Sequence, residues 1–345
     1  MKALIYEGPR EMHLREVEVP VPGDDEVLIR IAYSGICGSE LSGYYGHNSL
    51  RKPPLIFGHE FSGTIAALGE RAGKDTGLQI GIRVTANPLV TCGRCPTCLQ
   101  GRQQLCVSRK LLSAALPGSN AEYVKLPAQF VYPLPDSVSL ELGAMTEPAA
   151  CAVRAVELAE VSPKDHVLVM GLGPIGLLIV QVLSLYGVKR IFAADMNPER
   201  LEMASQWGVT AIHPKHTDVL EEVRRLTHGI GADVAIDAVG SGITRNQCIQ
   251  CAAFGGRVIF TGLHEADSTL PVNTIIRNEI RCLGSFAYSS LNFETALRWL
   301  SEGRIGFQAG VVKAPLEEGG TWFEKLLTNA GSTTKVLLYP PQEGE

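Results

Sequence analysis

Four closely spaced cysteines are the feature that most constrains how this chain can fold. They lie within fifteen residues in the pattern C-x2-C-x2-C-x7-C and are Cys92, Cys95, Cys98 and Cys106. Four thiolates that a short loop can gather around one point suit a closed tetrahedral Zn²⁺ site. Gly93, Pro96 and Gly101 supply the bends that such a loop needs. The spacing therefore predicts a structural zinc lobe at residues 90–108.

Iron–sulfur ligation and disulfide bonding are two other uses of closely spaced cysteines. Iron–sulfur clusters of the ferredoxin type share the spacing of the first three cysteines, but their fourth follows sooner and precedes a proline, which Cys106 does not. Disulfides would require an oxidising compartment. The sequence has nine cysteines, an odd number, and its first residues form no signal-peptide core. We therefore expect zinc ligation and a reducing cytoplasm.

Length and charge narrow the function classes. A chain of 345 residues exceeds one ordinary core, so two domains are expected. Hydrophobic residues make up 45% of it, with 36 glycines and 20 prolines, which is typical of a turn-rich globular protein. The formal net charge is −5 and the basic residues are scattered in small pairs, so nucleic acid is not an expected partner.

One uncharged segment resembles a membrane span on hydropathy alone. No charged residue occurs from Val167 to Val188, which is long enough to cross a bilayer. Glycines and a proline interrupt its first half, and no basic cluster flanks it. We interpret the segment as a buried strand, a tight turn and a buried helix, and expect no membrane association.

The pattern of apolar residues changes near Ala149. Before it, short runs between Gly, Pro and Asp clusters predict an irregular, barrel-like β domain, with strands at Val27–Ile31, Ser62–Ile65 and Arg83–Thr85. After it, strands alternate with helices, beginning with a helix through Cys151–Leu158 and a strand at Val167–Met170. This change predicts a boundary between a β-rich domain and an α/β domain with a parallel sheet.

A dinucleotide-binding motif follows the first strand of the α/β part. Its pattern is G-x-G-x-x-G, with Gly171, Gly173, Pro174, Ile175 and Gly176 as the residues expected to contact a cofactor. Such glycines let the backbone approach a pyrophosphate, and the helix N-terminus favours negative charge. Asp195 closes the next strand, where its carboxylate can bind the ribose hydroxyls and repel a 2′-phosphate. NAD is thus favoured over NADP, although Arg200 is near and Asp195 has the alternative role of a turn residue.

A second set of metal ligands lies in the β-rich part. A thiolate, an imidazole and a carboxylate leave one position open on zinc, as catalytic sites require. The candidates are Cys37, His59, Glu60 and Glu147. Taken singly, each has an ordinary alternative role: a small buried residue for the cysteine, a turn residue for the histidine, and a helix-start acid for Glu147.

The order of these motifs resembles the zinc-dependent medium-chain alcohol dehydrogenases, and within them the polyol branch of sorbitol and galactitol-1-phosphate dehydrogenases. The shared motifs are Cys-Gly-Ser, Gly-His-Glu, the four-cysteine lobe, Glu-Pro and Gly-Leu-Gly-Pro-Ile-Gly. The resemblance implies a GroES-like catalytic domain at residues 1–148, a Rossmann domain at 149–284, and a return to the first domain at 285–345. It also implies a homodimer or homotetramer.

Roles follow from the same resemblance. Cys37 and His59 would hold the catalytic zinc with either Glu60 or Glu147, and the two glutamates could exchange during turnover. Ser39 would contact the substrate and accept its hydroxyl proton. Further contacts with the cofactor would come from Val239, Gly262, Leu263, Ser285 and Phe286. The substrate pocket would be lined by Ser39, Tyr44, Phe286 and Tyr288.

The implied reaction is oxidation of a secondary alcohol to a ketone. Zinc would lower the pKa of the substrate hydroxyl, and hydride would pass to the nicotinamide because zinc is redox-inert. A threonine or other secondary-alcohol dehydrogenase, a metal-free reductase and a catalytically dead NAD-binding sensor are the alternatives. Cys37, His59 and Glu147 together argue against the metal-free reductase.

Three departures from the family pattern bear on the site. Glu40 stands where an aspartate is usual, in a place expected to orient the histidine ligand. Ser42 replaces the histidine of the liver-type proton relay, so we expect a water chain instead. Ala287 replaces an arginine of the sorbitol dehydrogenases, which disfavours sorbitol itself. A phosphorylated substrate would need a basic partner, which Arg51 or Lys52 could supply.

Overall fold

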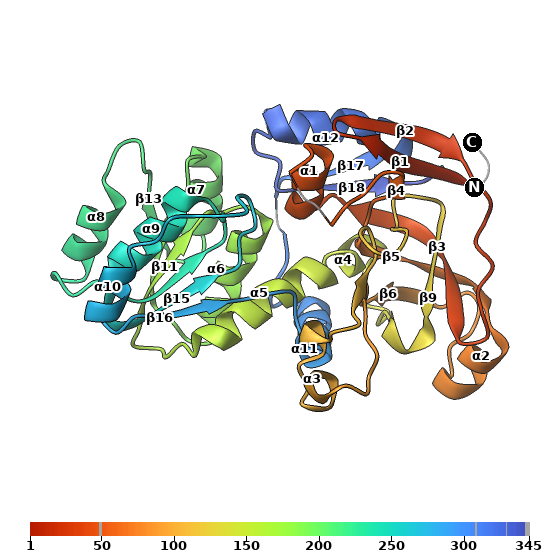
Figure 1. Cartoon of the computed structure of the whole chain (residues 1–345), viewed down its shortest axis with the longest axis horizontal. Coiled ribbons are helices and arrows are strands. Elements are labelled where there is room, and N and C mark those ends of the chain that lie inside the picture. The colour runs from red at the N-terminus through yellow and green to blue at the C-terminus, as the bar shows by residue number, and fades with distance from the viewer. Residues whose placement is uncertain (48–49, 308, 329, 342–345) are drawn as a thin grey trace. The chain divides into compact units, whose positions relative to one another are not determined.

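The structure is a computed structural model that describes residues 1–47, 50–307, 309–328 and 330–341. The chain divides into two compact units, one of Met1–Glu147 with Ser289–Glu345 and the other of Pro148–Tyr288. Figure 1 shows both units. The first unit is therefore built from the two ends of the chain, and the second from its middle.

The first unit is mainly β-structure. Its strands are β1 (Lys2–Gly8), β2 (Glu11–Glu16), β3 (Glu26–Gly35), β4 (Leu55–Ile56), β5 (Glu60–Leu68), β6 (Arg83–Ala86), β7 (Leu89–Val90), β8 (Lys110–Leu111), β9 (Tyr123–Pro127), β10 (Val131–Pro133), β17 (Val311–Pro315) and β18 (Lys335–Tyr339). The main sheet has the order β10-β6-β5-β3-β18-β17, with β9 also paired to β3. A smaller sheet has the order β2-β1-β4.

Helices of this unit are short. They are α1 (Gly38–Tyr44), α2 (Glu70–Thr76), α3 (Pro96–Leu99), α4 (Leu140–Gly143), α11 (Ser290–Ser301) and α12 (Gly319–Thr328), with single 3₁₀ turns at Gln103–Leu105, Ala128–Phe130 and Leu316–Glu318. Helix α5 (Thr146–Ala159) crosses the division between the units. It begins before the predicted Cys151, and this places Glu147 in its first turn.

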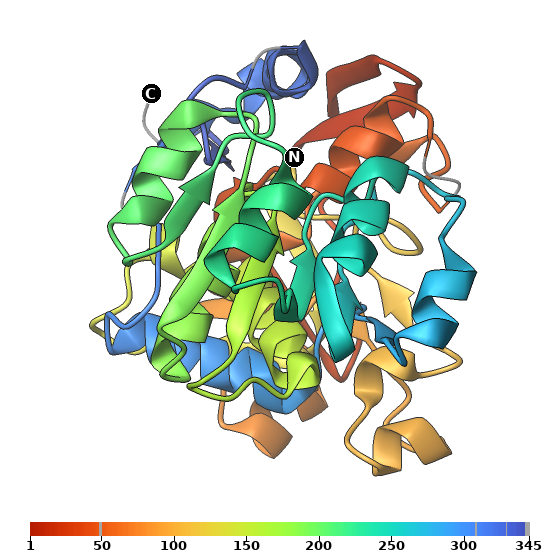
Figure 2. The same cartoon turned by 90° about the vertical axis from the view of Figure 1, so that its left-hand side faces the viewer.

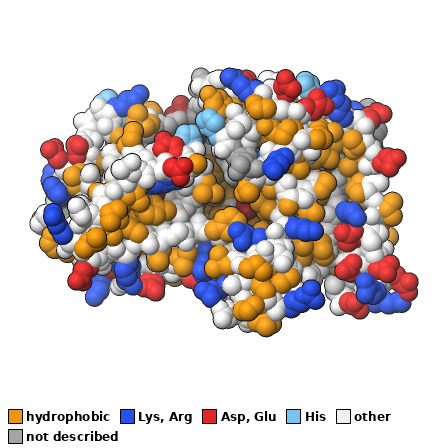
Figure 3. Space-filling model, in the orientation of Figure 1, with side chains coloured by type: hydrophobic (Ala, Val, Ile, Leu, Met, Phe, Trp, Pro, Cys, Tyr) orange, Lys and Arg blue, Asp and Glu red, His pale blue; other side chains and the backbone are white. Residues whose placement is uncertain are grey.

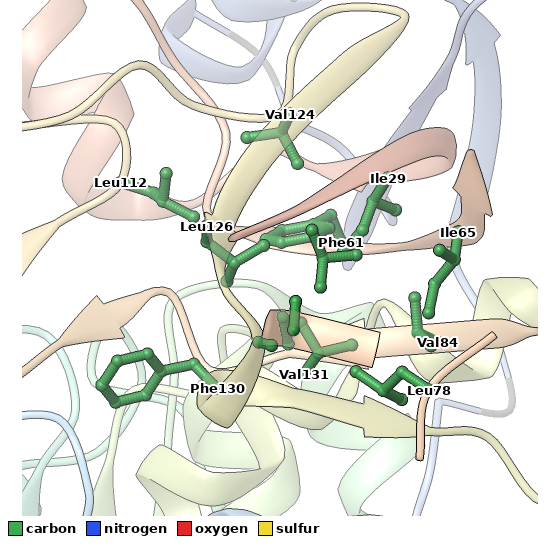
Figure 4. Packing of buried hydrophobic residues seen from close by; sticks show 14 of the residues in the cluster. Ile29, Phe61, Ile65, Leu78, Val84, Leu112, Val124, Leu126, Phe130 and Val131 are labelled. Carbon is green, nitrogen blue, oxygen red and sulfur yellow. The ribbon is translucent and has the colours of Figure 1, made fainter. Parts of the chain in front are cut away.

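A hydrophobic core forms where the strands of the main sheet curve around apolar side chains. Ile29 of β3 and Phe61 and Ile65 of β5 are buried there. Figure 4 shows these three gathered with Leu126 and Val84. Burying a side chain of this size stabilises the fold by about 1.5–3 kcal/mol, so the core fixes which faces of β3 and β5 point inward.

A second cluster joins the N-terminal and C-terminal segments of the same unit. Leu4 and Phe57 pack with Phe323 of α12 and Leu338 of β18, and all four are buried. The rings of Phe57 and Phe323 lie 5.9 Å apart. The end of the chain is thus an integral part of the first unit.

The second unit is a parallel sheet with helices between its strands. The strands are β11 (His166–Met170), β12 (Arg190–Ala194), β13 (Thr210–Ile212), β14 (Ala232–Asp237), β15 (Ala252–Phe260) and β16 (Arg281–Gly284). They pair in parallel in the order β13-β12-β11-β14-β15-β16, the doubly wound arrangement of dinucleotide-binding domains. Figure 2 shows these strands side by side, in green to blue.

The connecting helices follow from local signals in the sequence. They are α6 (Pro174–Leu185), α7 (Pro198–Ser205), α8 (Val219–Leu226), α9 (Gly242–Cys251) and α10 (Val272–Arg277). Asn197 caps α7 by accepting hydrogen bonds from the backbone N–H groups of Glu199 and Arg200, as the Asn-Pro-Glu pattern predicts.

The uncharged segment from Val167 to Val188 forms β11 and α6, as predicted. Helix α6 is buried on nearly all sides because it packs within the unit. Among the described residues, no helix combines the length and the apolar character that crossing a bilayer requires. On the face shown in Figure 3, acidic and basic side chains are interspersed.

Candidate metal centres and dinucleotide site

The register of two strands assembles the first group of metal ligands. Strands β3 and β5 are antiparallel, and Gly35 near the end of β3 lies opposite Glu60 at the start of β5. Cys37 lies two residues after the end of β3, and His59 immediately precedes β5. The ligand atoms of Cys37, His59 and Glu60 consequently all lie within 4.8 Å of one another.

Glu40 holds the imidazole of this group. Its Oε1 accepts hydrogen bonds from Nδ1 of His59 at 2.7 Å, the Gly58 N–H at 2.8 Å and the Ser113 hydroxyl at 2.6 Å. Burial alone would raise the pKa of Glu40, but His59, Arg51 and Ser113 lower it to about 2. Because Nδ1 is engaged, Nε2 is the ring nitrogen left for a metal. The longer Glu40 side chain therefore still orients the histidine.

A buried lysine holds the carboxylate of the group. Lys335 of β18 is 3% exposed, and its Nζ donates to both Glu60 oxygens, at 2.8 and 2.6 Å, and to the Ile36 carbonyl at 3.2 Å. Burial lowers the pKa of Lys335, but Glu60 and Cys37 outweigh it and raise the pKa above its usual value. The ammonium therefore uses its three donors, and two of them fix the position of the Glu60 side chain.

The other predicted residues of this site are placed differently. Glu147 is buried in the first turn of α5 but does not belong to the group of ligand atoms within 4.8 Å of one another. Ser39 Oγ donates to Cys37 Sγ at 3.4 Å and so lies beside the ligands. Tyr44 packs its ring on Phe323 and donates to the Arg10 carbonyl at 3.1 Å, and its role in the substrate pocket stays a prediction.

The four cysteines of the lobe converge as their spacing predicts. Their sulfur atoms all lie within 4.8 Å of one another. Cys92 and Cys106 are 3.5 Å apart at Sγ, close to the edge of about 3.8 Å for a tetrahedron with Zn–S bonds of about 2.3 Å. Hydrogen bonds from Thr97 and the Cys98 N–H lower the pKa of Cys95 to about 5. The cysteines are free thiols, so the disulfide alternative is wrong.

The glycine-rich turn sits between β11 and α6. Gly171 has φ +89°, which favours glycine, and a side chain on Gly176 would collide with the Gly171 carbonyl. Around Gly173, the residue that caps α6, a side chain would meet open space. The turn is therefore closed on its protein side and open where a pyrophosphate would approach.

Asp195 is attached to this turn. Its Oδ2 accepts a hydrogen bond from the Leu172 N–H at 2.6 Å, and its Oδ1 accepts one from the Asn197 N–H at 2.7 Å. It follows β12 directly and is half-buried, while Arg200 lies in the first turn of α7. The carboxylate is thus fixed next to the turn, with lone pairs left for a ligand.

Two further loops meet at the C-terminal ends of β14 and β15. A side chain on Gly240 would collide with Gly262, and one on Gly171 would collide with Val239. Buried Asp237 accepts hydrogen bonds from the Val239 and Gly240 N–H groups, both at 3.1 Å. Val239 and Gly262 are therefore close to the turn, as expected of cofactor contacts.

The remaining predicted residues follow these loops in the chain. Leu263 is 65% and Phe286 is 37% exposed, whereas Tyr288 is buried. The N–H of Ser285 donates to the Phe260 carbonyl at 2.8 Å, which extends the line of β16. The structure thus presents Leu263 and Phe286 at the surface of the second unit, where a ligand can reach them.

Both metal groups fit Zn²⁺ by the chemistry of their donors. Four thiolates suit a closed structural site, and the set of Cys37, His59 and Glu60 suits a site with an open position. The carboxylate bound to His59 Nδ1 is the usual partner of a zinc-bound imidazole. The residues present therefore fit one structural and one catalytic zinc.

Known proteins are similar to this chain over nearly its whole length. The family profile described as alcohol dehydrogenase GroES-like domain matches residues 23–136, and that described as zinc-binding dehydrogenase matches residues 174–302. Sorbitol dehydrogenase of Bacillus subtilis is 33% identical over 349 residues, covering 99% of this chain and 97% of that relative. The chain belongs to the zinc-dependent medium-chain alcohol dehydrogenases.

Further relatives of this dehydrogenase agree. D-xylulose reductase A of Aspergillus niger is 33% identical over 352 residues, covering 97% of this chain and 96% of that relative. A solved zinc-binding dehydrogenase of Sinorhizobium meliloti 1021, bound to NADP, has a TM-score of 0.89 at 29% identity and covers 98% of this chain and 99% of that one. The predicted family, the α/β fold class with GroES-like and Rossmann parts, and the zinc- and nicotinamide-dependent dehydrogenase activity are confirmed.

Sequence reasoning missed Lys335 in this dehydrogenase altogether. It opens the apolar strand Lys335–Tyr339, and a lysine at a strand end usually points into water. Its partner Glu60 is 275 residues away in the chain. Only the pairing of β18 with β3, next to β5, brings the two together. No local signal could have indicated the contact.

Proposed function

We propose that this protein oxidises a secondary hydroxyl of a polyol with NAD and gives a ketose. The observation that carries the proposal is the convergence of Cys37, His59 and Glu60, with Glu40 fixing the imidazole, in a unit of the zinc dehydrogenase family. The relatives named sorbitol dehydrogenase and D-xylulose reductase support a polyol as the substrate. The substrate class is thus a small polyhydroxy compound.

Each ligand of the proposed catalytic zinc has its own support. Cys37, His59 and Glu60 would hold the ion, and the open position would receive the substrate. When bound, Zn²⁺ acts as a Lewis acid that lowers the pKa of the substrate hydroxyl. We favour Glu60 over Glu147 because its carboxylate lies in the ligand group, and Lys335 holds that carboxylate in place through both oxygens. Glu147 remains the candidate to exchange with Glu60 as a zinc ligand, since its charge also contributes to raising the pKa of Lys335.

Ser39 is the residue that would handle the substrate's proton. Its Oγ lies beside Cys37 Sγ and accepts a hydrogen bond from Arg51 Nη2 at 3.1 Å. A guanidinium beside this oxygen disfavours an additional proton on it. Ser39 would therefore pass a proton onward rather than retain it.

The preference for NAD rests on Asp195. Its carboxylate is fixed at the edge of the glycine turn by two backbone N–H groups. A ribose diol can donate to it, whereas a 2′-phosphate would be repelled. Replacing Asp195 by Ser should therefore raise the KM for NAD and lower that for NADP, which initial rates with both cofactors measure.

The oligomeric state and the compartment are part of the proposal. Strand β16 is the last strand of its sheet, and Leu283 on it is 40% exposed, with Ile276 of α10 66% exposed. An uncovered edge strand with apolar neighbours favours pairing with a second copy, and hence a homodimer or homotetramer. The free cysteines and the thiolate lobe favour a reducing cytoplasm.

A panel of polyols, their phosphates, threonine and simple secondary alcohols, assayed by NADH absorbance, tests the function. We expect a polyol or its charged derivative to give the highest kcat/KM and the matching ketose to be reduced in the reverse direction. Turnover of threonine or a simple alcohol in preference to every polyol would contradict the substrate class. A protein that binds NADH with two zinc ions but turns over no alcohol would contradict the enzymatic role.

A further inference from the structure

Arg51 is a buried cation at the proposed catalytic site with too few partners. It is 5% exposed, and its Nη2 donates to Ser39 Oγ at 3.1 Å. Its Nε is buried with no hydrogen-bond partner, and within the described part of the chain Arg51 forms no ion pair. A buried charge is costly unless it is paired, so a guanidinium with one neutral partner calls for an explanation.

The chain makes room for this side chain. Gly43 of α1 lies against Arg51, and a side chain at Gly43 would collide with Cδ of Arg51. The guanidinium carbon lies 5.7 Å from the centre of the Phe57 ring, within reach of a cation–π interaction. The Arg51 side chain therefore runs alongside α1 and lies over an aromatic ring. Its position is fixed by these contacts, unlike that of a solvated surface arginine.

The acidic groups nearby are already engaged by other donors. The charge of Arg51 contributes to lowering the pKa of Glu40. The Oε1 of Glu40, however, already accepts hydrogen bonds from His59, Gly58 and Ser113. Glu60 is bound through both oxygens to Lys335. The guanidinium consequently keeps donors that no carboxylate of the site uses, and an arginine fork is suited to carboxylate and phosphate.

The neighbouring lysine lacks these properties. Lys52 is exposed, whereas Arg51 is buried beside the ligand group. From the sequence, either residue could bind a charged substrate, and the difference in burial distinguishes the two. Lys52 therefore provides a matched control, because it carries the same charge one residue away.

We propose that Arg51 binds an anionic group of the substrate, a carboxylate or a phosphate carried by the polyol, next to Ser39. The inference rests on the proposed function, since Ser39 marks the substrate only if Cys37 and His59 hold the catalytic zinc. Ser39 Oγ contacts both Arg51 and Cys37 Sγ, so a polyol with one hydroxyl at this serine extends toward the guanidinium. The substrate is then a sugar acid or a sugar-alcohol phosphate rather than a neutral polyol.

Kinetics with matched substrates test this inference. We would measure kcat and KM for a neutral polyol, the aldonate with the same carbon skeleton and the polyol phosphate, in wild type, R51M, R51K and K52M. The wild type should prefer one anionic substrate, and R51M should lower its kcat/KM about 10- to 100-fold, mainly through KM. R51K should recover part of the loss because it keeps charge without the fork. R51M should lower the kcat/KM for the neutral polyol much less than that for the anionic substrate, and K52M should change neither value.

A binding measurement gives a readout that does not depend on turnover. Sulfate should raise the Tm of the zinc-loaded wild-type enzyme relative to chloride at equal ionic strength, and R51M should abolish this rise while K52M keeps it. R51M and R51K also report by Tm whether the variants fold. An equal rise in R51M and wild type would overturn the inference.

Other outcomes separate this inference from the proposed function. NADH formation with a neutral polyol preferred over its anionic forms, and with R51M affecting all substrates alike, would overturn the anion site and leave the polyol dehydrogenase intact. A rise confined to the KM of NAD in R51M would also overturn it, because the guanidinium would then serve the cofactor. If no alcohol is oxidised, the proposed function fails, and the sulfate measurement alone decides whether Arg51 binds an anion.

Discussion

Single residues decide the chemistry of the first unit through paired charges. Glu40 and Lys335 each act on a metal ligand, the first on the imidazole of His59 and the second on the carboxylate of Glu60. All four side chains are buried, so these interactions are weakly screened by water. Ligand geometry is therefore set by residues that would not touch the metal themselves.

The buried pair of Lys335 and Glu60 gives a stability prediction. Replacing Lys335 by Met leaves the buried Glu60 without the partner that binds both of its oxygens, which should lower the free energy of unfolding by about 3–5 kcal/mol. The double variant K335M/E60Q removes both charges and should recover most of this loss. Urea unfolding of the zinc-depleted proteins, in which no metal ion competes for the Glu60 carboxylate, measures the effect.

Lys313 provides the control for this experiment. It lies on β17 and pairs with Glu141 at 3.3 Å, but both side chains are partly exposed. Lys313→Met should therefore cost less than about 1 kcal/mol. Equal losses for Lys335→Met and Lys313→Met would show that the buried pair has no special role.

At the scale of elements, turns and helix starts position the ligands. The glycine turn before α6 and the cysteine loop around α3 are short segments whose backbone must take one shape. Both were predictable, because the residues that shape them are adjacent in the sequence. The sequence predicted helix α5 from Cys151, but the helix begins at Thr146. Pro148 lies in its first turn, where proline is tolerated, so this proline did not mark the end of a loop.

The cysteine lobe should owe its stability to its metal. Cys98→Ser should reduce the zinc content by one per chain and lower the Tm by about 5–15 °C, because ligation supplies the folding energy of such a loop. Cys251→Ser is the matched control, since Cys251 is equally buried but lies in the apolar core of the second unit. Loss of zinc from Cys251→Ser, or its full retention by Cys98→Ser, would contradict this account.

The glycine turn should separate cofactor binding from folding. Gly173→Ala adds a methyl group in open space, so the Tm should stay within about 2 °C while the Kd for NADH rises about 10-fold. Gly176→Ala should lower the Tm as well, because its side chain meets the Gly171 carbonyl. Fluorescence titration of NADH measures the affinities. Unchanged binding in Gly173→Ala would show that the pyrophosphate does not lie against Gly173.

At the scale of the whole molecule, the separation of two residues along the chain decides whether their contact could be predicted from the sequence. The fold class and the ligand groups were predictable because each motif is compact in the sequence, as with Cys37 and Ser39 or His59 and Glu60. The contacts of Lys335 and Arg51 were not, because they depend on β18 returning to β3 and on Gly43 leaving space in α1.

Zinc content, measured together with turnover in wild type and Cys37→Ser, tests the central claim most directly. The account predicts two zinc ions per chain in the wild type, and one in Cys37→Ser with a folded protein, intact NADH binding and kcat lower by at least about 100-fold. A wild type that is fully active with one zinc ion, or a Cys37→Ser variant with near-native kcat, would contradict it.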